Sequence, residues 1–70
     1  MRVGERIRAL RTARKLTQEQ LAYRAGVSVG TIARIERGAT RPTLETLECL
    51  ARALDVSVAD LLGERGSDQV

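Results

Sequence analysis

Apolar residues recur every three or four positions along most of this chain, the spacing that places them on one face of an α-helix. Near the start, Val3, Ile7 and Leu10 share such a face and predict a helix over about residues 3–14, followed by a short connection at residues 15–16. The same spacing returns in four later segments, and no segment predicts a strand. The pattern therefore predicts an all-α fold of five helices.

Two short helices follow the first, and the sequence marks the ends of both. Thr17 precedes the second helix, Gln18–Ala25, and Ser28 precedes the third, Val29–Arg37. Thr and Ser side chains accept hydrogen bonds from the unpaired N–H groups of a first helical turn, so we expect both as N-caps. Gly26 provides the left-handed backbone conformation that ends a helix in a tight turn. Two helices joined in this way form a helix-turn-helix.

Neighbouring residues reinforce these helix starts. Thr17 and Gln20 have the spacing of a capping box, and Leu16 and Leu21 flank the cap as a hydrophobic staple. The residues that the two helices are expected to bury are Leu21, Ala22, Ala25, Ile32 and Ile35.

The remaining segments predict two more helices. Pro42 disfavours continuation of the third helix. Thr43 is expected to cap a fourth helix that ends near Leu54, and Ser57 a short fifth helix that Gly63 closes. The expected apolar stripe of the fourth helix is Leu44, Leu47, Leu50, Ala51 and Leu54.

The length of 70 residues allows one domain. We expect a compact helix-turn-helix domain over residues 1–63, with the helix-turn-helix itself at about 17–37. Residues 64–70 lack an apolar period and are expected to form a flexible tail. Because apolar runs are only a few residues long, we expect neither a membrane span nor a signal peptide, and we expect a cytoplasmic protein.

Residues that carry enzyme or metal chemistry are scarce. The chain has no histidine, and it shows no paired-carboxylate cleft, metal-ligand spacing or glycine-rich phosphate loop. The single cysteine, Cys49, lies in a helical apolar pattern and is interpreted as a small buried filler, with a reactive or metal-binding thiol as the alternative. We therefore expect no catalytic residue, metal, cofactor or small-molecule ligand.

The two halves of the chain differ in charge. Residues 1–41 contain ten Lys or Arg and three acidic residues, whereas residues 42–70 contain two and six. The half that holds the third helix would attract a polyanion and the other half would repel it. A solvated charged surface is the alternative interpretation.

One side of the third helix, opposite its isoleucines, is expected to face the major groove of DNA. It carries Gly30, Ala33, Arg34 and Arg37. Arg34 has the planar guanidinium that bonds guanine O6 and N7 together, and Val29 could contact a thymine methyl. Gly30 weakens a helix by about 1 kcal/mol relative to alanine. The presence of a glycine at this position is explained either by close approach of the helix to DNA or by relaxed selection at an exposed position.

Residues outside this helix are expected to contact the DNA backbone. Gln18 could bond a phosphate beside the N-terminus of its helix, unless it is an ordinary exposed residue. Arg37, Thr40 and Arg41, at the end of the third helix and in the loop after it, could bind the backbone of the same strand, unless that loop is merely solvated. The complete expected interface is Gln18, Ser28, Val29, Gly30, Thr31, Ala33, Arg34, Arg37, Thr40 and Arg41.

Glu36 is an acid near the end of a helix meant for DNA, where both the helix dipole and phosphate disfavour it. We therefore expect an internal partner for it, and we propose Arg11 of the first helix. Arg11, Glu36, Thr17 and Gly26 are thus expected to have structural roles.

The joint order and spacing of these motifs resemble the helix-turn-helix domains of the Cro and lambda-repressor type, often called the xenobiotic-response-element family. The resemblance covers about residues 5–62 and rests on the segments 16–22, 26–28, 31–32, 35–38 and 41–42, on residues 44 and 47, and on the segments 53–57 and 61–62. It implies a five-helix domain, a phosphate contact at Gln18, base contacts from positions 29, 30, 33 and 34, and a structural pair of Arg11 with Glu36. Positions 29, 30 and 33 often carry polar residues in such repressors but are valine, glycine and alanine here. Sequence preference would then depend on Arg34, on water or on DNA shape.

These observations predict a sequence-specific DNA-binding transcriptional regulator, most simply a repressor, whose third helix enters the major groove. One such helix covers few base pairs, so we expect a homodimer on a palindromic operator with half-sites about 34 Å apart. Apolar residues near Val56, Val58, Leu61 and Leu62 could form the dimer contact or could simply close the core. The alternative function is an antitoxin or other protein-interaction module that binds DNA as part of a complex.

Overall fold

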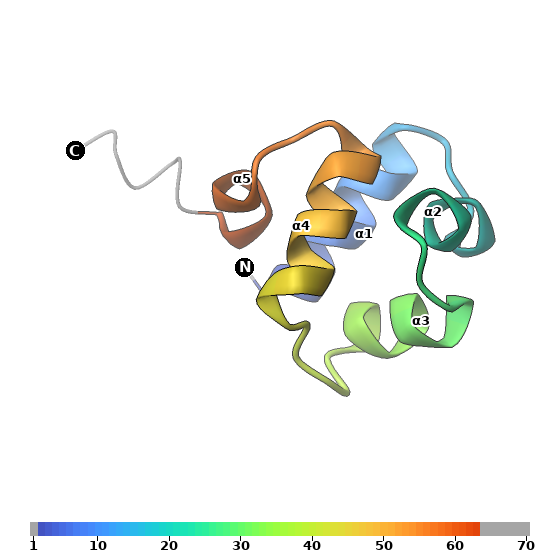
Figure 1. The fold of residues 1–70 in the computed structure, drawn as a ribbon, viewed down its shortest axis with the longest axis horizontal. Helices are drawn as coiled ribbons and strands as arrows, with labels where there is room; N and C mark the ends of the chain where they lie inside the picture. Colours follow the sequence, from blue (N-terminus) through green and yellow to red (C-terminus); the bar gives the residue numbers. More distant parts are fainter. Residues whose placement is uncertain (1, 64–70) are drawn as a thin grey trace.

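The computed structural model describes residues 2–63, and within that range the chain forms five helices and no strand (Figure 1). The helices are α1 (Val3–Ala13), α2 (Gln18–Ala25), α3 (Val29–Arg37), α4 (Leu44–Leu54) and α5 (Val58–Leu62). The all-α prediction is confirmed, and α2 and α3 have the predicted bounds. The segment 64–70, predicted as a flexible tail, lies outside the described residues.

Every helix contributes at least one fully buried aliphatic side chain to a single core. These side chains are Ile7, Leu21, Ile32, Ile35, Leu50, Leu54 and Leu61. Val56 and Val58 are half-buried and pack against this core, so most of the segment considered for a dimer contact closes the domain instead.

The helix ends follow the predicted capping chemistry. The Thr17 hydroxyl accepts a hydrogen bond from Gln20 N at 3.0 Å, and the Gln20 side chain accepts one from Thr17 N at 2.8 Å. Ser28 caps α3 by accepting from Thr31 N at 3.1 Å. Gly26 has φ = 75°, the left-handed conformation that turns the chain between α2 and α3.

Two predictions about burial were wrong. Leu44, placed in the apolar stripe of α4, is 65% exposed because the stripe continues past the edge of the core into the first turn of the helix. Cys49, interpreted as a buried filler, is only half-buried at the margin of the core. Helical periodicity gives the direction of a side chain but not the extent of the segments that cover it.

The backbones of α1 and α3 approach each other closely at Gly4. A Cβ built on Gly4 would lie 2.1 Å from the carbonyl oxygen of Ile35 and 3.2 Å from Glu36 Cα. Gly4 is buried, and the contact is with backbone rather than with a side chain that could move aside. The absence of a side chain at residue 4 therefore sets the distance between the two helices.

Candidate nucleic-acid interface

The outer side of α3 is open to solvent, whereas its inner side is fixed in the core. Ile32 and Ile35 are 0% and 1% exposed. On the other side Val29 is 42% exposed, Arg34 and Arg37 are exposed, and Gly30 and Ala33 are half-buried. We call Val29, Gly30, Ala33, Arg34 and Arg37 the outer face of α3. A helix anchored on one side and free on the other can enter a groove without losing core contacts.

The N-terminal turn of α3 carries a short polar chain of side chains. Ser28 Oγ and Thr31 Oγ1 share a hydrogen bond of 2.8 Å, and Arg34 Nη2 donates to Thr31 Oγ1 at 3.4 Å. Arg34 thus extends back along the helix over its first turn. Ser28 and Thr31, both predicted at the interface, form this polar chain together with Arg34.

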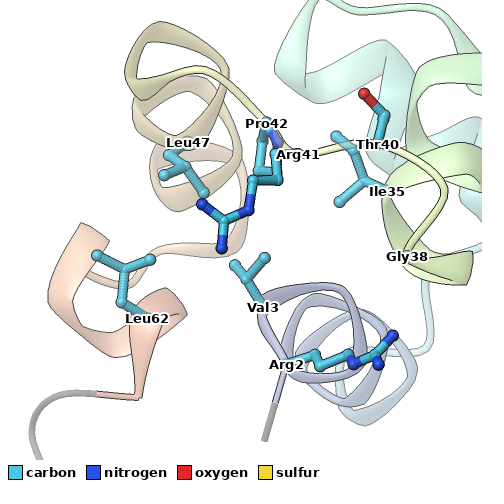
Figure 2. A pocket seen from close by; sticks show the side chains of 9 residues that line it. All are labelled: Arg2, Val3, Ile35, Gly38, Thr40, Arg41, Pro42, Leu47 and Leu62. Carbon is cyan, nitrogen blue, oxygen red and sulfur yellow. The ribbon is translucent and has the colours of Figure 1, made fainter.

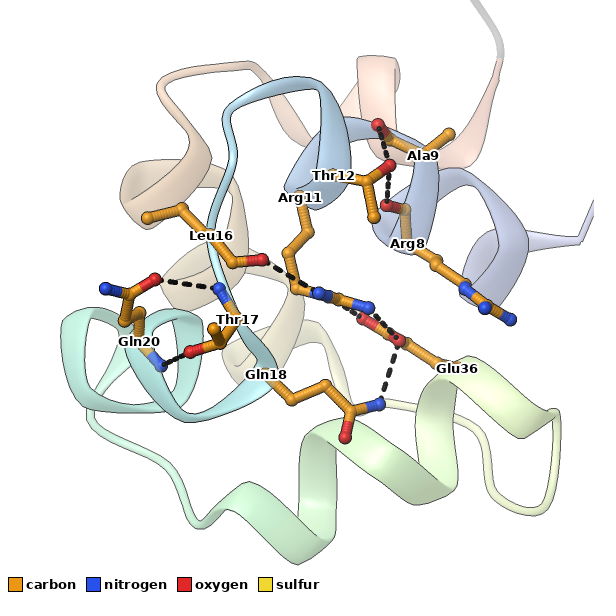
Figure 3. A network of polar contacts seen from close by, with 9 residues as sticks. All are labelled: Arg8, Ala9, Arg11, Thr12, Leu16, Thr17, Gln18, Gln20 and Glu36. Carbon is orange, nitrogen blue, oxygen red and sulfur yellow. Dashed lines mark hydrogen bonds and ion pairs between the residues drawn. The ribbon is translucent and has the colours of Figure 1, made fainter.

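Glu36 is the centre of a polar network that joins α1, α2 and α3 (Figure 3). Arg11 Nε donates to Glu36 Oε2 at 2.7 Å, and Arg11 Nη2 donates to Glu36 Oε1 at 3.0 Å. The two side chains are only 11% and 4% exposed, respectively. Arg11 Nη1 also donates to the Leu16 carbonyl at 2.8 Å. The structure thus contains the pair that the sequence predicted, with the planar two-point geometry of Arg and carboxylate.

Gln18 takes part in this network, which the sequence analysis did not foresee. Its Nε2 atom donates to Glu36 Oε1 at 3.0 Å. An amide nitrogen has two N–H groups, so the second one can still donate to an external acceptor. The chemistry that could have indicated this role of Gln18 is that a buried carboxylate needs more than one hydrogen-bond donor.

The pKa of Glu36 lies below its ordinary value of 4.5. Burial by itself raises this pKa, but the hydrogen bonds from Arg11 and Gln18 and the charges of Arg11 and Arg8 outweigh burial. Glu36 is therefore ionised at neutral pH and holds Arg11 and Gln18 in place.

Thr40 and Arg41 lie in the loop between α3 and α4. Both are exposed and border a groove (Figure 2), in which the Arg41 guanidinium extends towards Val3 and Leu62. Arg2, which the sequence analysis did not single out, lies at the other side of this groove. Its Nη1 atom is 3.2 Å from where a Cβ on Gly38 would be. Arginines from the chain start and from this loop thus lie near the C-terminal end of α3.

Within residues 2–63, no group of three or more His, Cys, Asp or Glu residues could hold a metal ion. No helix in the same part of the chain has the length and apolar character needed to cross a membrane.

Comparisons with known proteins agree with this geometry. Residues 7–61 match the family model described as helix-turn-helix. The immunity repressor protein of Bacillus phage phi105 is 50% identical over 64 residues, covering 91% of this chain and 44% of the repressor. The HTH-type transcriptional regulator DdrOP3 of Deinococcus deserti is 44% identical over 62 residues, covering 89% of this chain and 48% of the regulator. The chain thus spans less than half the length of these two relatives.

A solved structure of the P22 c2 repressor protein in complex with a synthetic operator is similar to the fold. Its TM-score is 0.85 and its sequence identity 41%, covering 91% of this chain and 97% of the repressor chain. The residues that match the family, 7–61, include all of α2 and α3.

Proposed function

The chain belongs to the helix-turn-helix family, and from this premise we propose that it is a sequence-specific DNA-binding transcriptional repressor. In this proposal it acts in the cytoplasm and is not an enzyme. The observation that carries the proposal is the solvent-exposed outer face of α3, which bears Arg34 and Arg37 on a helix anchored by two buried isoleucines. The similarity to a repressor bound to its operator supports it.

In this proposal α3 enters the major groove, where Val29, Ala33, Arg34 and Thr31 contact base edges, Gly30 lies beneath Arg34, and Ser28 lies at the groove rim. Gln18, Thr40, Arg37 and Arg41 contact phosphates on either side. Gln18 is suited to this role because Glu36 fixes its amide group. Few side chains here read bases directly, since residues 29, 30 and 33 are apolar or small, so Arg34 carries most of the direct readout.

Binding as a homodimer on a palindrome belongs to the same proposal. A single α3 helix covers only a few base pairs, and two copies related by a two-fold axis double the recognised sequence. Leu62 is the apolar residue of α5 that remains exposed, at 42%, and Leu44 adds a second exposed leucine.

We expect the affinity for duplex DNA to fall as the salt concentration rises. If Arg37 and Arg41 each neutralise one phosphate, the logarithm of the association constant falls with a slope of about −2 per protomer against the logarithm of salt. Between about 50 and 200 mM salt this amounts to roughly a tenfold loss. Fluorescence anisotropy over a salt series measures the slope. A flat dependence would favour the protein-interaction module, which touches DNA only through a partner.

Substitution of Arg34 and of Gln18 is expected to have different consequences. Arg34→Ala should weaken binding to the preferred sequence by about 1–3 kcal/mol and relax preference at one base pair. Gln18→Ala should weaken all sequences alike, because a phosphate contact carries no base information. Binding to duplexes that differ at single positions separates the two effects, with Arg52→Ala on the exposed side of α4 as the control for lost charge. Equal losses on every sequence for both variants would make Arg34 a phosphate contact.

A further inference from the structure

The conformation of Arg34 depends on the residue one turn before it. Helical side chains point towards the N-terminus, so Arg34 extends over residue 30. Its Nη1 atom lies 3.3 Å from where a Cβ on Gly30 would be. That distance is shorter than ordinary van der Waals contact. A methyl group at residue 30 would therefore require the guanidinium to shift by a few tenths of an ångström.

A second contact holds the same guanidinium from the side. Arg34 Nη2 donates to Thr31 Oγ1 at 3.4 Å, a long hydrogen bond. The Thr31 hydroxyl is itself fixed by its 2.8 Å bond to Ser28 Oγ, which also caps the helix. Thr31 thus offers an oriented acceptor to an arginine that is otherwise exposed.

We propose that Gly30 and Thr31 are positioning residues that hold the Arg34 guanidinium over the first turn of α3 and so determine which base pair it reads. This inference rests on the proposed function, since it concerns how Arg34 selects a base. The N-terminal turn of such a helix is the part that contacts base edges. An arginine held there before binding loses less conformational freedom on contact than a mobile one.

This inference gives Gly30 a role different from close approach of the backbone to DNA. If the glycine only makes room for a base, adding a methyl group harms binding whether or not Arg34 is present. If it makes room for Arg34, the harm disappears once Arg34 is removed. The two roles therefore predict different outcomes of a double-mutant cycle.

The experiment compares the wild type, Gly30→Ala, Arg34→Ala and the double variant on duplexes derived from a selected binding sequence and its single-base-pair changes. We expect Gly30→Ala to reduce the preference at the Arg34 base pair about fivefold or more. It should at the same time raise the thermal midpoint by about 4 °C, because alanine favours the helix. In the Arg34→Ala background the same change should leave affinity unaltered.

Two outcomes overturn the inference while leaving the proposed function intact: an unchanged base preference in Gly30→Ala, or a loss that persists without Arg34. Failure of the wild type to bind any selected duplex overturns the proposed function instead.

A measurement without DNA tests the positioning contact directly. ¹⁵N relaxation of arginine Nε–H groups should show Arg34 more ordered than the exposed Arg52 in the wild type. Thr31→Val removes the acceptor and should raise Arg34 motion to the level of Arg52, whereas Thr31→Ser keeps the hydroxyl and should restore order. Equal mobility of Arg34 and Arg52 in the wild type would refute the inference.

Discussion

Gly4→Ala is expected to destabilise the domain by about 3 kcal/mol or more, although alanine is the better helix former. The added methyl carbon would lie 2.1 Å from the Ile35 carbonyl oxygen, a contact that only separation of α1 and α3 relieves. Separation would open the core around Ile7 and Ile35, both of which are fully buried.

Urea unfolding measures this loss, and the domain offers its own matched control. Gly30→Ala places the same methyl group near the start of another helix, where it meets only the side chains of Arg34 and Ser28, and should stabilise the fold slightly. Opposite signs for the two substitutions would show that packing against α3 outweighs helix propensity at residue 4. A Gly4→Ala variant as stable as the wild type would contradict the close approach of the two helices.

Arg11→Ala is expected to destabilise the fold by about 3 kcal/mol, because it leaves the carboxylate of Glu36 buried with a single neutral donor. Arg11 also bonds the Leu16 carbonyl, so the turn before α2 loses a contact as well. Chemical denaturation measures the change, and Arg14→Ala at the exposed end of α1 is the control for removing an arginine. Similar stabilities of the two variants would show that the network contributes little.

The Glu36 network also predicts how stability changes with acid. Because the pKa of Glu36 is lower in the folded than in the unfolded chain, its contribution is fully present above pH 4.5 and is lost as the pH falls through the folded pKa. Glu36→Gln should be less stable than the wild type at neutral pH, and the difference should shrink in acid. A constant difference between the two proteins would contradict the lowered pKa.

The predictions for Gly4 and for the Glu36 network bear on DNA binding, because the same contacts position the proposed interface. Gly4 sets the depth at which α3 lies against α1, and Glu36 orients Gln18 from within α3. Variants that remain folded should therefore bind all DNA sequences less tightly.

Local chemistry explains why much of the fold could be predicted. A cap needs only a hydroxyl three residues before an N–H group, so Thr17 and Ser28 marked the starts of α2 and α3. Gly26 marked the turn because a left-handed residue rarely carries a Cβ. The partner of Glu36 was predictable because an acid at that end of a helix needs a nearby cation.

Other features depend on neighbours distant in sequence. The residues near Gly4 in the sequence do not show that it packs closely against another helix rather than merely weakening its own. Likewise, the residues near Leu44 do not show that it extends beyond the core. Lys15 and Asp55 adopt the left-handed conformation, with φ values of 58° and 59°, and their residue types did not predict it. The contact of Arg34 with Thr31 in the first turn of α3 is likewise visible only in the tertiary structure.

By itself, the sequence determined the positions of the helices, their ends and the side of α3 that is buried, because periodicity and capping act within a few residues. Only the tertiary structure decided how closely α1 and α3 pack, which donors surround Glu36 and where the Arg34 guanidinium lies. Those features depend on distances between segments, and a one-dimensional pattern does not contain them.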